Sequence, residues 1–274
     1  MEAMTFQSRI GLAEPLPEEE YLRLRAKWHN ETEGTRHLED GYSCTLCRNK
    51  GYSMEVRQDG GDLRLVTVPC SCEPVRRSIL RMKKSGLEHQ IRSCTFDSFQ
   101  EHTPWQRAMK ADARAYAEDP RGWFFVGGQS GAGKTHLCTA ICRELLLQGR
   151  EVVYMLWRDE IVRLKGAVTE ADQYTGLIDR YKRAEVLYID DLFKTGKGRD
   201  GHTPQPSPAD IHTAFEILNF RYCDPNKLTI LTSELTAREL LEVDEALAGR
   251  ILERAQTIHI GKDREKNWRL QGRH

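Results

Sequence analysis

The C-terminal two thirds of the chain alternates short apolar runs with longer segments that place apolar side chains three and four positions apart. Buried strands that alternate with helices are typical of a parallel sheet covered by helices on both faces. We therefore expect an α/β fold. The predicted strands are 123–127, 151–156, 186–190, 228–232 and 257–260, and the predicted helices are 104–118, 134–149 and 209–222, with further helical stretches ending near 184 and 254.

The N-terminal third has a different pattern. Residues 15–33 have helical periodicity, 63–68 alternate as in a strand, and 75–86 form a basic helix that ends at Gly86. The stretch 41–73 otherwise has little helical periodicity, so we place a domain division near residue 94. The expected parts are a helical N-terminal segment (1–40), a cysteine-bearing module with a basic linker helix (41–94), the α/β domain (95–261) and a basic tail (262–274).

Charge and composition exclude several classes of protein. The 274 residues carry 41 basic and 41 acidic side chains, so a protein that is basic over its whole surface is excluded. The neutral total hides opposed net charges of −4, +5, −4 and +3 in the four parts, and the basic parts are candidates for phosphate contact. Neither an apolar run of membrane-spanning length nor an export signal is seen, so we expect a cytoplasmic protein without a membrane partner.

One segment between a predicted strand and a predicted helix matches the phosphate-binding loop G-x-x-x-x-G-K-[ST]. Its glycines let backbone N–H groups point at phosphate oxygens, and the helix adds its N-terminal dipole. Lys134 is expected to reach the β- and γ-phosphates of ATP, and Thr135 to bind Mg²⁺. A chance glycine-rich turn would rarely have this context. The predicted nucleotide-binding residues are Gly128, Gln129, Ser130, Gly131, Ala132, Gly133, Lys134, Thr135 and His136.

The apolar run 186–190 ends in two acids, as the second half of such a site requires. We assign Asp190 to Mg²⁺ and Asp191 to the attacking water. The strand 151–156 lies between the loop and these acids in the sequence, which indicates the P-loop branch of AAA+ and RecA-like ATPases. Two acids that merely cap a strand are the alternative.

Two further features are candidates for sensing the nucleotide. The strand 228–232 ends in Thr232, Ser233 and Glu234, and in AAA+ proteins such a strand lies between those of the loop and the acids, presenting a polar side chain to the γ-phosphate. Arg250 and Arg254 share one helical face. They are candidates for an arginine finger that reaches the ATP of a neighbouring subunit, with a solvated basic face as the alternative.

Four of the eight cysteines form two close pairs, with spacings C-x-x-C and C-x-C. A tetrahedral Zn²⁺ site takes four thiolates in such pairs, although C-x-x-C is the usual second pair. A redox dithiol or an iron–sulfur cluster remains an alternative. The predicted zinc ligands are Cys44, Cys47, Cys70 and Cys72.

These motifs, in this order, resemble the DnaC/DnaI-type helicase loaders over roughly residues 41–260, above all loader-like ATP-binding proteins of phages and Gram-positive bacteria. The segments that carry the resemblance are the four-cysteine module, KKSG, TFDSF, GGQSGAGKTH, YIDDLFK, LTSEL and DEALAGRILERA. The resemblance implies a P-loop AAA+ (ASCE) sheet behind a small zinc-binding module. It also implies a DnaB-type replicative helicase and single-stranded DNA as partners.

The sequence departs from this family at two positions. Glu234 stands where many members have asparagine, which puts a sensor role there in doubt, and Asp191 replaces the glutamate common in AAA+ enzymes. The shorter carboxylate predicts slow hydrolysis, suited to a switch. The stretch 194–208, rich in glycine, proline and lysine, is either a DNA-facing loop or an insertion without structure.

The function that these features favour is ATP-dependent loading of a DnaB-type helicase onto single-stranded DNA, with self-association through the arginine-finger region. One alternative is an IstB-like ATPase that helps a transposase, which shares the core motifs but generally lacks a zinc module. The other is a zinc-ribbon adaptor whose P-loop binds nucleotide without hydrolysing it.

Overall fold

The computed structural model describes residues 16–84, 88–194 and 205–271. Gly86, at which the basic helix was predicted to end, and most of the stretch 194–208 lie outside the described residues. The chain divides into two compact units, Met1–Arg77 and Ser78–His274, which we call unit 1 and unit 2.

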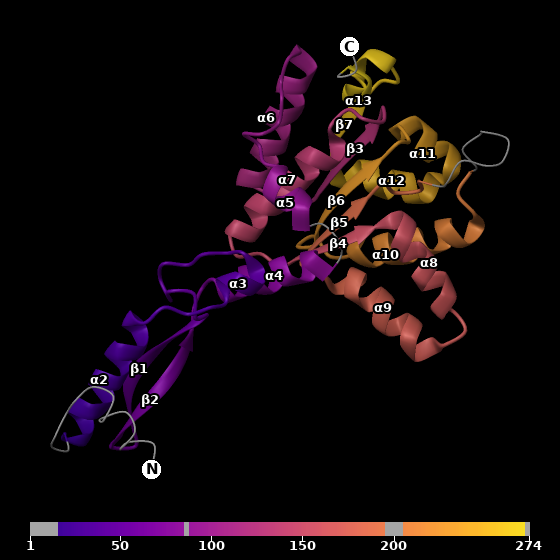
Figure 1. Ribbon diagram of the computed structural model, residues 1–274. Helices are drawn as coiled ribbons and strands as arrows, with labels where there is room; N and C mark the ends of the chain where they lie inside the picture. The colour runs from indigo at the N-terminus through magenta and orange to yellow at the C-terminus, as the bar shows by residue number, and fades with distance from the viewer. Residues whose placement is uncertain (1–15, 85–87, 195–204, 272–274) are drawn as a thin grey trace. The chain divides into compact units, whose positions relative to one another are not determined.

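Unit 1 combines a helix with a two-stranded antiparallel sheet (Figure 1). The predicted helix and the strand around 63–68 are both present, but the sequence analysis missed the strand that pairs with the latter. Gly60 and Gly61 both have positive φ and form the two-residue turn between Asp59 and Asp62, so this glycine pair was the available signal. The elements are α2 (Glu18–Glu31), α3 (His37–Asp40), β1 (Tyr52–Asp59) and β2 (Asp62–Pro69).

The division between the units falls within α4 (Glu73–Lys84), whereas the sequence analysis placed it near residue 94. The difference arises from α5 (Glu88–Ser93), which contacts α7 (Lys134–Leu147) of unit 2. Ile91 on α5 packs against the core of that unit. The segment before residue 94 therefore contributes to the α/β unit.

Unit 2 is built on one five-stranded parallel sheet in the order β4-β5-β6-β3-β7. The order confirms that the 228–232 strand lies between the strand of the glycine-rich loop and the strand that carries the two acids. Polar ends of β3, β5 and β6 thus meet at one edge of the sheet, where α/β proteins bind ligands. The strands are β3 (Trp123–Gly128), β4 (Val152–Leu156), β5 (Val186–Asp190), β6 (Leu228–Ser233) and β7 (Ala255–Ile260).

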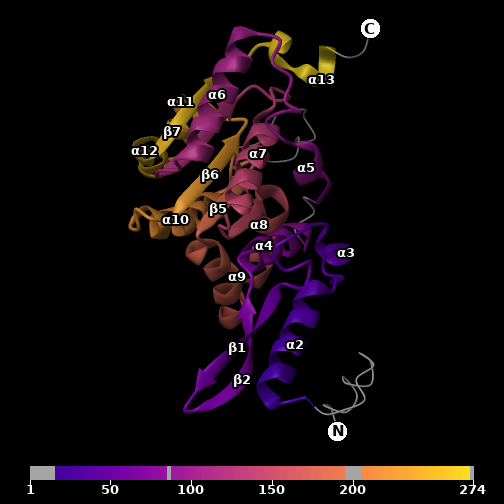
Figure 2. The same ribbon diagram turned by 90° about the vertical axis from the view of Figure 1, so that its left-hand side faces the viewer.

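Helices cover both faces of this sheet, as Figures 1 and 2 show. Alternate residues of each strand enter two separate cores: Phe124 and Val126 pack with α6 and α7, whereas Trp123 and Phe125 pack with the helices of the opposite face. Burial on both faces explains why the strands are continuous apolar runs. The other helices of unit 2 are α6 (Pro104–Glu118), α8 (Trp157–Ala167), α9 (Ala171–Arg183), α10 (Pro208–Tyr222), α11 (Ala237–Val243), α12 (Glu245–Arg254), the 3₁₀ helix η1 (Arg264–Lys266) and α13 (Trp268–Gln271).

No helix in the described part of the chain combines the length and the apolar character needed to cross a membrane.

Candidate functional site

The glycine-rich loop connects β3 to α7 at the centre of the sheet. Gly128 has φ 116° and a Cβ there would collide with the carbonyl oxygen of Ile260, so only glycine fits beside β7. Gly133 has φ 88° and caps the N-terminus of α7. The loop therefore lies directly at a helix N-terminus, which is a favourable position for phosphate groups.

Lys134 is buried within this loop and is only 6% exposed. Its Nζ donates hydrogen bonds to the carbonyl oxygens of Gly128 and Gln129, both at 2.8 Å. Burial lowers the pKa of Lys134, because water is largely excluded from its ammonium group. The loop thus holds one cation where the phosphates of a nucleotide would lie.

The carboxylate of Asp190 lies beside Thr135, as the sequence predicts. Thr135 Oγ1 donates to Asp190 Oδ1 at 3.0 Å, Thr232 Oγ1 donates to the same oxygen at 2.6 Å, and Tyr154 donates to Oδ2 at 3.1 Å. Burial raises the pKa of Asp190, against the effect of these hydrogen bonds. A carboxylate and a hydroxyl oxygen at a phosphate loop fit Mg²⁺, which usually takes few protein ligands together with phosphate oxygens and water.

Thr232 forms hydrogen bonds with both acidic residues. Its fully buried hydroxyl group donates to Asp190 and accepts from the backbone N–H of Asp191 at 2.8 Å. The sequence analysis named Thr232 only as one of three nucleotide-sensing candidates, and Tyr154 was missed altogether. Ser233 does not line the nucleotide pocket; its hydroxyl group donates to the carbonyl oxygen of Leu192 at 2.7 Å.

Glu234 forms an ion pair with Lys194, a residue that the sequence analysis did not single out. Lys194 Nζ lies 3.0 Å from Glu234 Oε1 and 2.8 Å from Asp191 Oδ2. Burial would raise the pKa of Glu234, but Lys194 and Ser130 outweigh it and lower the value. The only sequence signal for Lys194 was its place three residues after Asp191.

Lys134, Thr135, Asp191, Lys194 and Glu234 line one pocket of about 390 Å³, and the buried Asp190 adjoins it through its hydrogen bond to Thr135. The C-terminal segment also contributes, since the N–H of Trp268 donates to the carbonyl oxygen of Gly131 at 3.0 Å. His136 lies in the wall, where its Nε2 is 2.9 Å from the carbonyl oxygen of Thr95. Trp268 and Arg269, which belong to the predicted basic tail, thus line part of the pocket. The lining residues are Gln90, Cys94, Ser98, Phe99, Gln100, Gln106, Ser130, Gly131, Ala132, Gly133, Lys134, Thr135, His136, Asp191, Lys194, Glu234, Trp268 and Arg269.

Arg250 and Arg254 lie on α12, outside the residues that line this pocket. Arg250 Nε donates to Asn219 Oδ1 at 3.0 Å, and its guanidinium lies 4.9 Å from the centre of the Phe215 ring. Arg254 donates to the carbonyl oxygen of Tyr222 at 2.6 Å. Both arginines therefore contact α10 and its end.

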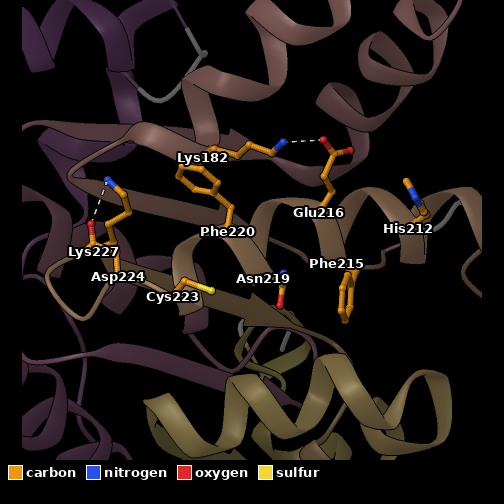
Figure 3. A pocket seen from close by; sticks show the side chains of 9 residues that line it. All are labelled: Lys182, His212, Phe215, Glu216, Asn219, Phe220, Cys223, Asp224 and Lys227. Carbon is orange, nitrogen blue, oxygen red and sulfur yellow. Dashed lines mark hydrogen bonds and ion pairs between the residues drawn. The ribbon is translucent and has the colours of Figure 1, made fainter.

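Asn219 and Phe215 also line a second cavity, of about 620 Å³, shown in Figure 3. Its two lysines are already paired: Lys182 lies 2.6 Å from Glu216, and Lys227 lies 3.8 Å from Asp224. The cavity is a poorer phosphate site than the smaller pocket, because it has neither a glycine-rich loop nor an unneutralised cation.

The four cysteines of unit 1 come together as the spacing predicts. Their sulfur atoms all lie within 4.8 Å of one another, and the pairs Cys44–Cys70 and Cys47–Cys72 are 3.8 and 3.6 Å apart. Tetrahedral Zn–S bonds of about 2.3 Å place sulfur atoms about 3.8 Å apart. All four are free thiols, so the set fits a closed Cys₄ zinc site.

Arg76 packs against this cysteine cluster. It is fully buried and donates to both carboxylate oxygens of Asp40, at 2.8 and 2.6 Å, and to Asn49 Oδ1 at 3.0 Å. Its Nε lies 3.4 Å from Cys72 Sγ. Arg76 lies in the basic part of the chain that is a candidate for phosphate contact, but its charge is used within unit 1.

Comparison with known proteins places these sites in context. The family described as IstB-like ATP binding protein matches residues 74–273. The phage-like element PBSX protein XkdC of Bacillus subtilis (strain 168) is 32% identical over 246 residues, which are 84% of this chain and 87% of XkdC. The replicative helicase loader DnaC of Escherichia coli (strain K12) is 29% identical over 116 residues, 40% of this chain and 46% of DnaC. This chain thus aligns with less than half of DnaC.

The fold of unit 2 has solved counterparts as well. The crystal structure of the DnaC helicase loader superimposes with a TM-score of 0.54 at 19% identity, covering 62% of this chain and 98% of that one. At this identity the likeness concerns the fold alone, and it confirms the expected parallel sheet flanked by helices.

Proposed function

Because the chain belongs to the family of IstB-like ATP-binding proteins, we propose that it is an AAA+ ATPase that loads a DnaB-type replicative helicase onto single-stranded DNA. ATP is its nucleotide, and the pocket beside Lys134 is the place we assign to it. Within that pocket we assign Mg²⁺ to Thr135 and Asp190, and the attacking water to Asp191. Zn²⁺ is assigned to the four cysteines of unit 1.

The observation that carries the proposal is the division of these tasks between two units. Unit 2 holds the nucleotide groups, whereas unit 1 holds the Cys₄ cluster and two leucines that are exposed: Leu38 at 75% and Leu46 at 78%. Exposed leucines beside a rigid metal cluster offer an apolar contact to a protein partner. We therefore assign helicase binding to unit 1 and ATP-dependent control of it to unit 2. The printed name of DnaC, a replicative helicase loader, supports the loading activity.

The proposal is tested by capturing a DnaB-type helicase on the immobilised full-length chain, with and without Mg–ATP. We expect capture, and we expect Leu46→Ser to weaken it at least about tenfold through loss of apolar burial. Leu241→Ser is the matched control, because Leu241 is an exposed leucine, at 41%, on α11 of unit 2. Absence of a complex under both conditions would contradict helicase loading.

A transposase helper is the second candidate, because the matching family is the IstB-like one. Capture of a transposase in place of the helicase would favour it. A non-hydrolysing adaptor would instead bind the helicase equally with and without ATP and release no phosphate.

We further propose that Arg250 or Arg254 acts on the ATP of a neighbouring subunit. Alanine at the acting residue is expected to reduce hydrolysis at least about tenfold, because a cation that stabilises the transferred phosphoryl group is lost. ATP binding should be unchanged. The measurements are phosphate release and nucleotide affinity for each variant, and phosphate release of the wild type at several protein concentrations. A specific rate that does not rise with protein concentration would contradict action between subunits.

A further inference from the structure

Lys194 occupies a bridging position in the nucleotide pocket that the proposed function does not use. Its ammonium group lies between two carboxylates, 2.8 Å from Asp191 and 3.0 Å from Glu234. All three residues line the pocket, and their side chains are 31%, 21% and 35% exposed, respectively. The bridge is therefore shielded from bulk water but open to a ligand.

The turn that presents Lys194 is strained. Asp191 and Phe193 have positive φ values of 58° and 61°, a backbone conformation that bulky residues rarely adopt. Such a conformation is retained only where its surroundings impose it. Strain of this kind is concentrated at ligand-binding and switch segments.

Burial imposes this conformation. Leu192 is fully buried and Phe193 is 4% exposed. The Phe193 and Trp157 rings pack edge to face, with their centres 5.5 Å apart. The N–H of Leu192 donates to the carbonyl oxygen of Thr232 at 2.8 Å, and Ser233 donates to the carbonyl oxygen of Leu192. Two hydrogen bonds to β6 thus fix the position of this turn, and Lys194, the next residue, lines the pocket.

Because of the acids in the pocket, binding of a nucleoside triphosphate depends on the positive charge of Lys194. Asp191 and Glu234 both line the pocket, and their negative charges repel the phosphates of a nucleotide. The lysines and arginines among the described lining residues are Lys134, Lys194 and Arg269. Of these, Lys194 is the one hydrogen-bonded to both acids. Although burial opposes its charge, the two carboxylates raise the pKa of Lys194, so it is a cation at neutral pH.

We propose that Lys194 distinguishes ATP from ADP by contacting the γ-phosphate. With ATP bound, its Nζ moves from the two carboxylates to γ-phosphate oxygens, which frees Asp191 to orient the attacking water. With ADP bound, the bridge between Asp191 and Glu234 stays closed. This inference rests on the proposed binding of ATP beside Lys134, and it adds a response to the state of the nucleotide.

The test compares the affinities of the full-length chain for Mg–ADP and for a non-hydrolysable Mg–ATP analogue. In Lys194→Met we expect the affinity for the analogue to fall about 10- to 100-fold, the usual effect of losing a hydrogen bond between charged groups. The affinity for ADP should change less than about twofold. Lys182→Met is the matched control, because Lys182 is a partly buried lysine, 16% exposed, that pairs with Glu216 in the other cavity. Thermal melting of each variant checks that it folds.

A second comparison separates phosphate contact from mere neutralisation of the acids. If Lys194 only neutralises them, Lys194→Met combined with Asp191→Asn and Glu234→Gln regains the preference for the analogue, and the inference is overturned. Equal loss of both affinities, or no loss, also overturns it. A triple variant that still lacks the preference supports it. If the wild type binds neither nucleotide, the proposed ATP site is wrong and the inference fails with it. If the wild type binds both nucleotides, the ATP site stands and the variants test the role of Lys194 alone.

Discussion

Replacing Lys134 by alanine is expected to reduce ATP hydrolysis about 10³-fold, the largest change of activity that the structure predicts. Lys134 is 6% exposed, and its Nζ lies where the phosphates would pass over the loop. Removing a preorganised charged donor from such a site costs about 10²–10³ in rate, because its stabilisation of the charge that develops in the transition state is lost. Phosphate release and nucleotide affinity are the measurements.

The variant needs two controls, because alanine also leaves the carbonyl oxygens of Gly128 and Gln129 without their donor. Lys134→Met keeps most of the volume and should lose activity equally. Lys227→Ala removes a lysine from the cavity of Figure 3 and should keep full activity. Hydrolysis within about twofold of the wild type in Lys134→Ala would contradict the assignment of the loop.

Removing the zinc that we propose for unit 1 is expected to unfold that unit and leave unit 2 intact. Among the described residues of unit 1, the buried apolar side chains are few: Ala26, Val75 and three of the four cysteines. So small a core supplies little of the free energy of folding, whereas zinc bound by a set of cysteines supplies roughly 10 kcal/mol or more. The metal content, the proteolysis of the hairpin formed by β1 and β2, and ATP binding are the three measurements.

Cys72→Ser should reproduce the effect of a chelator, because Cys72 is buried in the cluster. Cys223→Ser is the matched control, since Cys223 is exposed on unit 2. A chelated protein whose hairpin resists proteolysis as well as the untreated protein does would sink the zinc assignment. Loss of ATP binding on chelation would show that the two units do not fold independently.

The sequence determined the strands of unit 2, most of the helices and the motifs, because each is encoded by neighbouring residues. An apolar run such as that of β5 predicts its own burial, and the loop around Lys134 carries its glycines, lysine and threonine within a few positions. The cysteine spacing likewise predicted that the four cysteines come together. The hairpin strand β1 was missed although Tyr52, Met54 and Val56 alternate with polar residues; none of its residues is fully buried, so the run is only weakly apolar.

Only the tertiary structure decided how these motifs are completed. Thr232 joins Asp190 across 42 positions of sequence, and Tyr154 joins it across 36. Lys194 reaches Glu234 because the buried, strained turn at Phe193 fastens it over the pocket, and Trp268 reaches Gly131 from the C-terminal segment. Such contacts depend on the order of strands in the sheet and on which side chains the cores bury. A sequence read locally does not specify either, because both follow from the lowest free energy of the whole domain.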